Sequence, residues 1–316
     1  SVIILPYRNP IILAKAIATA DLLSKGRVIF GAAVGWMEGE FAALNAPFAS
    51  RGKVSNEYLR LLKELWTNAT PSFQGEYFQL SGVTFSPMPV QQPHPPVWVT
   101  MGSAGSAAQV AQRGHIGGVF LAGYPKIRTV FDGYRQGYLD THGSDAPIDR
   151  LAYCALIHVG KTEKEGLEGA EKLLWYMSSN KVPPQFSNPP GYHSPAMAAA
   201  MMRGNNSGTG LPTSTNLAEQ MARGNVFAGT PDQVYDQIKN FYDYCGGFGN
   251  LMMMSQAGFM TFDETLASMK LFSEEVYPRL KELTAGYDAG EMQEIKAALP
   301  DVENVDVSDL ASEFVR

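Results

Sequence analysis

Cysteine is scarce in this sequence, where Cys154 and Cys245 are the only two among 316 residues. They lie far apart, with no CxxC pair and no histidine–cysteine cluster, so the sequence indicates neither a disulfide framework nor a metal site. Free thiols favour a reducing, cytoplasmic setting. No apolar run approaches the ~18 residues of a membrane-spanning helix, and the opening SVIILP lacks the basic region of a signal peptide. We therefore expect no membrane segment.

Basic charge is also in short supply, with 25 Lys and Arg against 31 Asp and Glu and a net charge of −6. Residues 286–316 carry eight acidic side chains against Lys296 and Arg316, so the rest of the chain is neutral. A neutral body with an acidic end argues against nucleic acid and anionic membranes as partners. We predict one domain over residues 1–285, followed by a solvated acidic tail over 286–316.

Familiar catalytic patterns are missing too. The sequence contains no carboxylate pair at the expected turns, no Ser/His/Asp order and no HExxH motif. Of the five histidines, His142 and His158 fall where a structural role is the better interpretation. His193 lies in a Pro/Gly-rich stretch that could close over a ligand, and it is a weak catalytic candidate.

What the sequence does contain is a repeated alternation of short apolar runs with capped helical patterns, which is typical of parallel βα units. Six runs are predicted to be parallel strands, and helices are predicted between them. The strands are expected at Val2 to Leu5, Arg27 to Ala33, Val97 to Met101, Gly118 to Ala122, Tyr153 to Val159 and Asn250 to Met254. A closed (β/α)8 barrel needs two more strands, so we predict an α/β barrel that is incomplete at its N-terminus.

Two stretches interrupt the alternation. Thr67 to Pro96 is predicted to be a β-arm with a proline-rich end. Asn180 to Asn225 is predicted to be a long irregular insertion that serves as a lid. After it, Thr230-Pro231-Asp232-Gln233 forms a capping box that predicts the start of a helix.

The strand-to-helix turns are rich in Gly, Ala and Ser, and sites so poor in acids and bases usually depend on a cofactor. In Gly102-Ser103-Ala104-Gly105-Ser106, backbone N–H groups, the helix dipole and the hydroxyls of Ser103 and Ser106 could hold a phosphate. The same residues also suit simple helix capping, and the sequence leaves both interpretations open.

Three stretches resemble the luciferase-like flavin-dependent monooxygenases: Asn9 to Trp36, His94 to Gly114 and Gly229 to Leu280. The resemblance implies a (β/α)8 barrel, often dimeric, that receives reduced FMN from a separate flavin reductase. In that family the flavin reacts with O2 to form a C4a-peroxyflavin. The resemblance places the flavin phosphate at Gly102, Ser103 and Ser106, and the flavin ring beside Ala33, Val34 and Gly35.

The chain departs from bacterial luciferases at two of these positions, because Ala33 replaces a reactive cysteine and Val34 replaces a phosphate-binding arginine. We therefore expect oxidation of a small apolar organic substrate without light emission. The expected pocket residues are Trp36, Met101, Phe120 and Tyr192. Two alternatives remain open, an F420-dependent oxidoreductase that transfers hydride and a non-catalytic flavin-binding subunit.

Overall fold

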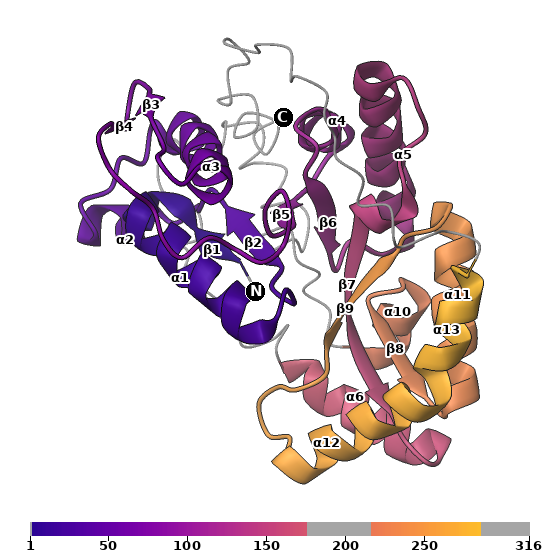
Figure 1. Cartoon of the computed structure of the whole chain (residues 1–316). Coiled ribbons are helices and arrows are strands. Elements are labelled where there is room, and N and C mark those ends of the chain that lie inside the picture. Colours follow the sequence, from indigo (N-terminus) through magenta and orange to yellow (C-terminus); the bar gives the residue numbers. More distant parts are fainter. Residues whose placement is uncertain (1, 176–215, 286–316) are drawn as a thin grey trace.

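A parallel sheet runs through the computed structural model, which describes residues 2–175 and 216–285 (Figure 1). The described part of the chain has seven strands in this sheet, which confirms the α/β class. They are β1 (Ile3–Ile4), β2 (Phe30–Ala33), β5 (Val97–Thr100), β6 (Ile116–Phe120), β7 (Leu151–Val159), β8 (Val226–Gly229) and β9 (Asn250–Met254).

The long strand β7 organises the second half of the sheet. Its residues 151–154 pair with β6 and its residues 156–159 pair with β8, while β9 pairs with residues 152–156. Because Ala152 and Cys154 pair with both β6 and β9, these two strands must lie on opposite edges of β7. All six predicted strands are present, and β8 was missed because it is short and directly follows the stretch predicted to be a lid.

Helices follow most of the strands. They are α1 (Pro10–Ser24), α2 (Glu38–Ala43), α3 (Arg51–Thr67), α4 (Ala104–Gln112), α5 (Gly123–His142), α6 (Glu163–Leu173), α10 (Leu217–Ala222), α11 (Pro231–Cys245), α12 (Phe262–Leu271) and α13 (Tyr277–Leu283), with short 3-10 turns at Leu5–Tyr7 and Ile148–Arg150 and a π-helical turn at Phe272–Val276. Helices α1, α4, α6, α10, α11 and α12 begin at side-chain caps. The Thr230 capping box is present with both hydrogen bonds. No helix among the described residues is long and apolar enough to cross a membrane.

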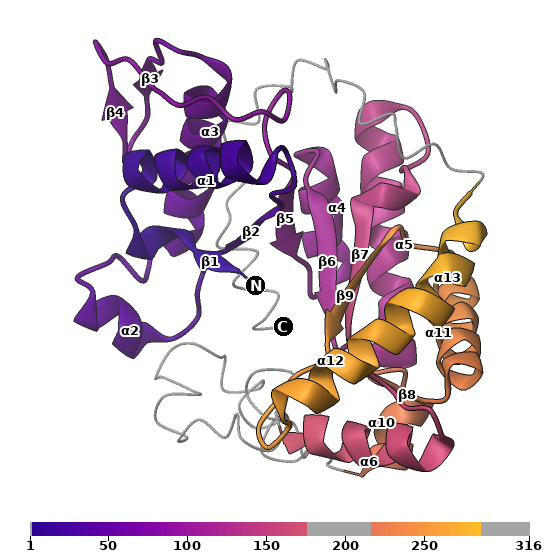
Figure 2. The ribbon, with the colours of Figure 1, turned by 60° about the horizontal axis from the view of Figure 1, so that its bottom comes forward.

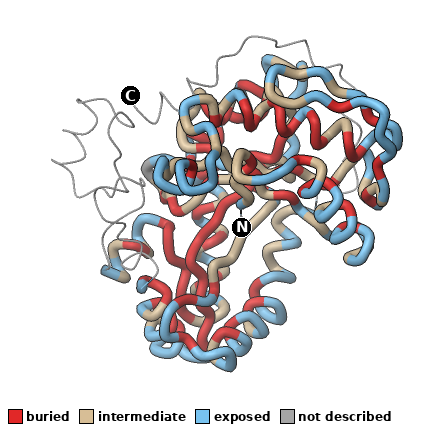
Figure 3. Tube along the Cα trace, turned by 90° about the vertical axis from the view of Figure 1, so that its left-hand side faces the viewer, coloured by how far each residue is buried: buried red, intermediate tan, exposed pale blue. Residues whose placement is uncertain are grey.

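One face of the sheet, which we call the helix face, packs against α1, α3, α4, α5 and α11 (Figure 2). Phe30 and Val97 belong to a core with α1 and α3, and Val119 and Tyr153 belong to a second core with α4, α5 and α11. Figure 3 shows buried stretches along the strands and alternating burial along the helices. This alternation is expected of amphipathic helices on an apolar sheet.

The residues on the opposite face, which we call the inner face, are identified by the alternation of side chains along each strand. In β2 the burial alternates, with Phe30 and Ala32 buried and Gly31 and Ala33 half-buried. Residues that are paired between neighbouring strands point to the same face, so the registers identify the inner-face residues of the other strands. The inner-face residues are Gly31, Ala33, Trp98, Thr100, Gly118, Phe120, Ala152, Cys154, Met252 and Met254.

The predicted β-arm is a small antiparallel pair, β3 (Phe73–Gln74) and β4 (Gln79–Leu80). The buried carboxylate of Glu57 on α3 accepts hydrogen bonds from the backbone N–H groups of Glu76, Tyr77 and Phe78 at 2.7–2.9 Å. These charge-assisted bonds satisfy the backbone N–H groups in the turn of the arm and attach the arm to α3.

The predicted lid is corrected at its end. Residues 176–215 lie outside the described residues, but residues 217–222 form α10 instead of an irregular loop. The Asn216 side chain accepts from the N–H of Glu219, which is an ordinary N-cap. This cap is the signal that the sequence interpretation overlooked.

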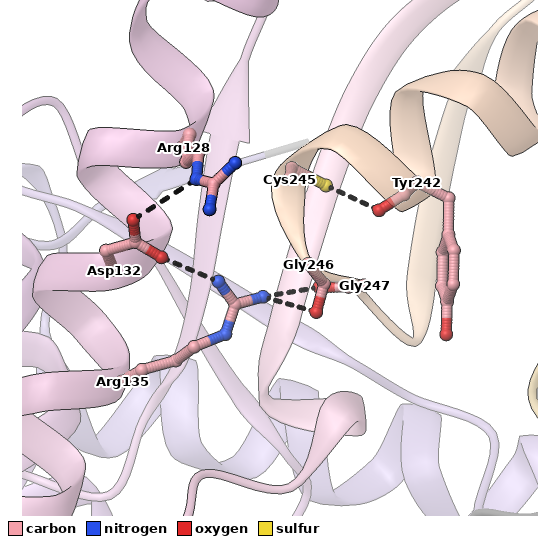
Figure 4. A network of polar contacts seen from close by, with 7 residues as sticks. All are labelled: Arg128, Asp132, Arg135, Tyr242, Cys245, Gly246 and Gly247. Atoms are coloured by element: carbon pink, nitrogen blue, oxygen red, sulfur yellow. Dashed lines mark hydrogen bonds and ion pairs between the residues drawn. The ribbon is translucent and has the colours of Figure 1, made fainter.

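The end of α11 is held by an arginine from α5 (Figure 4). Arg135 donates from Nη2 to the carbonyls of Gly246 and Gly247, both at 2.9 Å. Asp132 orients the guanidinium through a 3.1 Å contact with Nη1 and also pairs with Arg128 at 3.7 Å. A cation at the carboxyl end of a helix is favourable because it meets the negative end of the helix dipole.

Candidate active site at the carboxyl ends of the strands

Two of the predicted cofactor-binding turns lie side by side. Strands β2 and β5 are parallel neighbours, with Ala32 opposite Val99. Their carboxyl ends therefore meet at one edge of the sheet, and β2 ends at Ala33 while β5 ends at Thr100. The Ala33–Gly35 turn and the Gly102–Ser106 turn consequently flank the same place, as barrel active sites require.

The Gly102–Ser106 turn is a complete capping box. Ser103 Oγ accepts from the N–H of Ser106 at 3.2 Å, and Ser106 Oγ accepts from the N–H groups of Gly102 and Ser103 at 3.1 and 3.0 Å. The capping interpretation is therefore confirmed. Ala104 and Gly105 open the first turn of α4, where backbone N–H groups have no acceptor within the helix. These groups can still receive an anion.

Gly35 requires glycine for two reasons. Its φ is +83°, and a Cβ there would lie 2.8 Å from Ile4 and from the Phe41 ring. Its carbonyl accepts from Nε of Arg51 at 3.2 Å, and Arg51 Nη1 donates to the Phe48 carbonyl at 2.9 Å. Arg51 is only 9% exposed, so a buried cation lies beside the turn.

Arg51 was missed by the sequence interpretation, and no local signal points to it. It stands at the first position of α3 and reaches a carbonyl 16 residues earlier across α2 and its loop. Its guanidinium also stacks on Phe48, 4.0 Å from the ring centroid. The site therefore has a fixed arginine although Val34 occupies the position where the resemblance expects one.

The titratable groups near these turns are unsuited to proton transfer at neutral pH. Tyr7 donates to Glu40 Oε2 at 2.9 Å, and burial together with that carboxylate raises the pKa of Tyr7 far above its usual range. Burial raises the pKa of the Cys154 thiol on the inner face to about 12. A protonated, buried thiol is a poor nucleophile. The arrangement suits cofactor chemistry better than acid–base catalysis by side chains.

The predicted pocket residues separate into two groups. Trp36, directly after Gly35, is half-buried, and Phe120 is half-buried at the end of β6 on the inner face. Leu121, next to Phe120, is buried and has a φ of +45°, a strained conformation that often marks functional sites. Met101 instead lies in the helix-face core, where its Sδ packs tightly against Gly117. The alternation along β5 turns it away from the inner face.

Tyr192 and His193 lie outside the described residues. The described part of the chain holds no group of three or more His, Cys, Asp or Glu side chains that could bind a metal ion.

The fold and the position of these turns are those of an α/β barrel with its site at the carboxyl ends of the strands, and comparison with known proteins agrees with this fold. The sequence profile of the luciferase-like monooxygenases matches residues 1–246. The chain belongs to that family.

Individual relatives match at modest identity. The FMNH(2)-dependent dimethylsulfone monooxygenase of Pseudomonas putida is 35% identical over 108 residues, which are 33% of this chain and 30% of that protein. The chain thus spans about a third of that relative in the matched region. The F420-dependent glucose-6-phosphate dehydrogenase of Amycolatopsis mediterranei is 27% identical over 287 residues, which are 87% of this chain and 76% of that protein.

Solved structures share the fold. The oxygenating constituent of 3,6-diketocamphane monooxygenase from Pseudomonas putida, in complex with FMN, has a TM-score of 0.68 at 17% identity and covers 88% of this chain and 78% of its own. The monooxygenase RslO1 from Streptomyces bottropensis has a TM-score of 0.69 at 19% identity, covering 89% and 77%. The described strands therefore form part of a luciferase-type barrel.

Proposed function

We propose that this protein is an FMNH2-dependent monooxygenase that receives reduced FMN from a separate flavin reductase and oxidises a small apolar organic substrate with O2. The observation that carries the proposal is the adjacency of the Gly35 turn and the α4 N-terminus at the carboxyl ends of β2 and β5. When bound, reduced FMN would supply the electrons that activate oxygen.

The residues fit a flavin that carries a phosphate. The N–H groups of Ala104 and Gly105 and the dipole of α4 would hold the phosphate, with Ser103 and Ser106 keeping the turn in shape. Gly35 lets the backbone approach the ring closely, and Arg51 fixes the Gly35 carbonyl and supplies a positive charge. Each of these roles concerns binding and orientation.

The inner face would provide the substrate cavity. Gly31, Ala33 and Gly118 leave room near the strand ends, while Trp36 and Phe120 supply apolar surface. An apolar cavity excludes water from the reacting atoms and protects an oxygenating cofactor from side reactions. No side chain near the turns needs to exchange a proton in this account.

Reaction with F420 is the second candidate, because the F420-dependent relative matches 87% of the chain. The two functions differ in oxygen use. Reduced FMN made by the reductase consumes O2 even without substrate, so the diagnostic of a monooxygenase is a product that carries an oxygen atom from labelled O2, whereas an F420 enzyme would reduce or oxidise F420 without O2. Substrate-dependent F420 turnover under anaerobic conditions, with no oxygenated product in the FMN assay, would overturn the proposal.

We also propose a homodimer in the cytoplasm. Helix α1 exposes an apolar stripe of Ile12, Ala16, Ala20 and Leu23, with Ile12 70% and Leu23 78% exposed. The spacings of four, four and three residues place these side chains on one line. Light scattering should give twice the chain mass for the wild type and a monomer for Leu23→Glu, and a wild-type monomer at every concentration would contradict this.

A further inference from the structure

A cavity lies between α6 and α12 beyond the carboxyl end of β7, and none of its lining residues belongs to the proposed flavin site. In both Figure 1 and Figure 2 these two helices run beside each other at one end of the molecule. The cavity measures about 1030 Å³, which is at the upper end for small-molecule pockets. Its walls are joined by the ion pair of Lys172 with Glu264 and by the 2.8 Å hydrogen bond from the Val159 N–H to Ser268 Oγ.

The cavity carries an excess of negative charge. Four glutamates line it against two lysines, Lys161 and Lys172. Three of the glutamates have partners: Glu165 with the Lys161 N–H at 3.0 Å, Glu168 with Lys164 at 3.8 Å, and Glu264 with Lys172. Within residues 2–175 and 216–285, Glu171 makes no hydrogen bond or ion pair of this kind. Glu171 therefore has no partner there, and the charge of Glu165 is also not neutralised because its partner is a neutral backbone N–H.

Two aromatic rings line the same cavity as that carboxylate. Glu171 lies on α6, and Trp175 comes two residues after the end of this helix at Leu173. The Trp175 ring meets Phe259 edge to face, with centroids 6.0 Å apart at 69°. A carboxylate beside aromatic faces is the combination that attracts organic cations.

His158 contributes a polar group to the same cavity. It is only 6% exposed, its Nδ1 has no hydrogen-bond partner among the described residues, and its ring lies against Gly169, where any Cβ would collide with it. Burial, helped by Lys172, lowers the pKa of His158, although Glu264 opposes this. The imidazole is therefore neutral at pH 7, and a neutral imidazole can accept a hydrogen bond.

We propose that this cavity binds an organic ammonium ion, with Glu171 and the Trp175–Phe259 pair receiving the cationic group. Leu174, Met260 and Leu271 line the remainder and would contact the apolar part of the ligand. The glutamates disfavour an anion of the same size. This site does not depend on the flavin chemistry proposed above.

The test is calorimetric titration of the full chain with three probes of equal size: benzylamine, benzyl alcohol and benzoate. We expect saturable binding of benzylamine, and binding at least about tenfold weaker for the other two. Glu171→Gln should weaken benzylamine binding about tenfold, whereas Glu168→Gln, one turn away and already paired, should weaken it less than about threefold. Both positions are exposed, so both variants should fold.

Three results would overturn the proposal. One is equal or tighter binding of benzoate, and another is no difference between Glu171→Gln and Glu168→Gln. The third is displacement of benzylamine by FMN, because that would place the amine in the flavin site. The NMR resonances of the His158 ring show whether benzylamine binds in this cavity. They should shift on addition of benzylamine but not of benzoate.

Discussion

The two faces of the sheet follow different rules. On the helix face, Phe30 and Tyr153 are buried among aromatic and aliphatic side chains from several helices. On the inner face, Gly31, Trp98 and Gly118 are half-buried, and the two glycines have no side chain that could pack. Along β2, β5 and β6 the packed core therefore lies on the helix face, and the inner face has small residues where barrel enzymes place their ligands, whereas along the end of β7 both faces are buried, with α6 covering the inner one.

Buried polar groups do not follow this division. Tyr153 on the helix face donates to the Gly224 carbonyl at 2.8 Å and accepts from the Gly123 N–H at 3.2 Å. Trp98 on the inner face has a buried Nε1 with no partner among the described residues, and so does the hydroxyl of Tyr58 in the helix-face core. Unpartnered buried groups are uncommon in proteins, and here they occur on both faces.

The largest effect should come from the helix-face core. Phe241 is fully buried and contacts Tyr153, Tyr124 and Phe227, with ring centroids 4.3–5.6 Å apart. Phe241→Ala should lower the free energy of unfolding by about 3–5 kcal/mol in urea titrations, because it leaves a cavity. Phe262→Ala, at a side chain 76% exposed, should change it by less than ~0.5 kcal/mol. Equal losses of unfolding free energy in the two variants would contradict the contrast between the buried core and the exposed surface.

A substitution at Gly35 tests the proposed flavin site. Gly35→Ala should lower the affinity for reduced FMN at least about tenfold, because the new Cβ meets Ile4 and Phe41 and shifts the turn. Gly82 also has a positive φ, +67°, but no atom lies within 4 Å of an added Cβ. Gly82→Ala should therefore cost only about 1 kcal/mol of backbone strain and leave FMN affinity unchanged. Unchanged affinity in Gly35→Ala would remove Gly35 from the binding account.

Arg135 tests a contact on the helix side that is remote from the flavin turns. Arg135→Ala removes both hydrogen bonds to the Gly246 and Gly247 carbonyls and should lower the free energy of unfolding by about 1–2 kcal/mol. Arg128→Ala, which removes only an exposed ion pair, should cost less than ~0.5 kcal/mol. Thermal or urea unfolding measures both, and neither should alter FMN affinity.

Lys63 gives a pH signature of stability. Burial, reinforced by Arg150 and Arg113, lowers the pKa of Lys63 to about 8. Between about pH 8 and pH 10 the unfolded chain binds more protons at this lysine than the folded one, so stability should rise with pH in that window. Lys63→Met should abolish this rise, which amounts to roughly 2 kcal/mol between pH 8 and pH 10. A rise that persists in the variant would assign it to another group.

The sequence alone predicts the local features well. The caps at Ser103 and Thr230 involve residues three positions apart, so a single chain segment contains the whole signal. The six strands are also found, because alternating apolar runs and capped helices repeat along the chain.

Long-range features escaped prediction for physical reasons. Arg51 and Glu57 act on backbone groups 16 and 19 or more residues away, and nothing in the neighbouring residues shows that they are buried. Strand β8 owes its place to β7, which extends past β6 and offers Leu156 to Val159 as a partner. Met101 was assigned to the pocket because the strand phase could not be set without the register of β5.

The most direct test of the account is anaerobic equilibrium titration with reduced FMN, for the wild type, Gly35→Ala and Gly82→Ala. The account predicts one saturable site, intact in Gly82→Ala and weakened at least about tenfold in Gly35→Ala. Rapid mixing of the wild-type complex with oxygenated buffer should then give flavin oxidation that differs from that of free FMN. Absence of FMN binding together with tight binding of F420 would contradict the central claim.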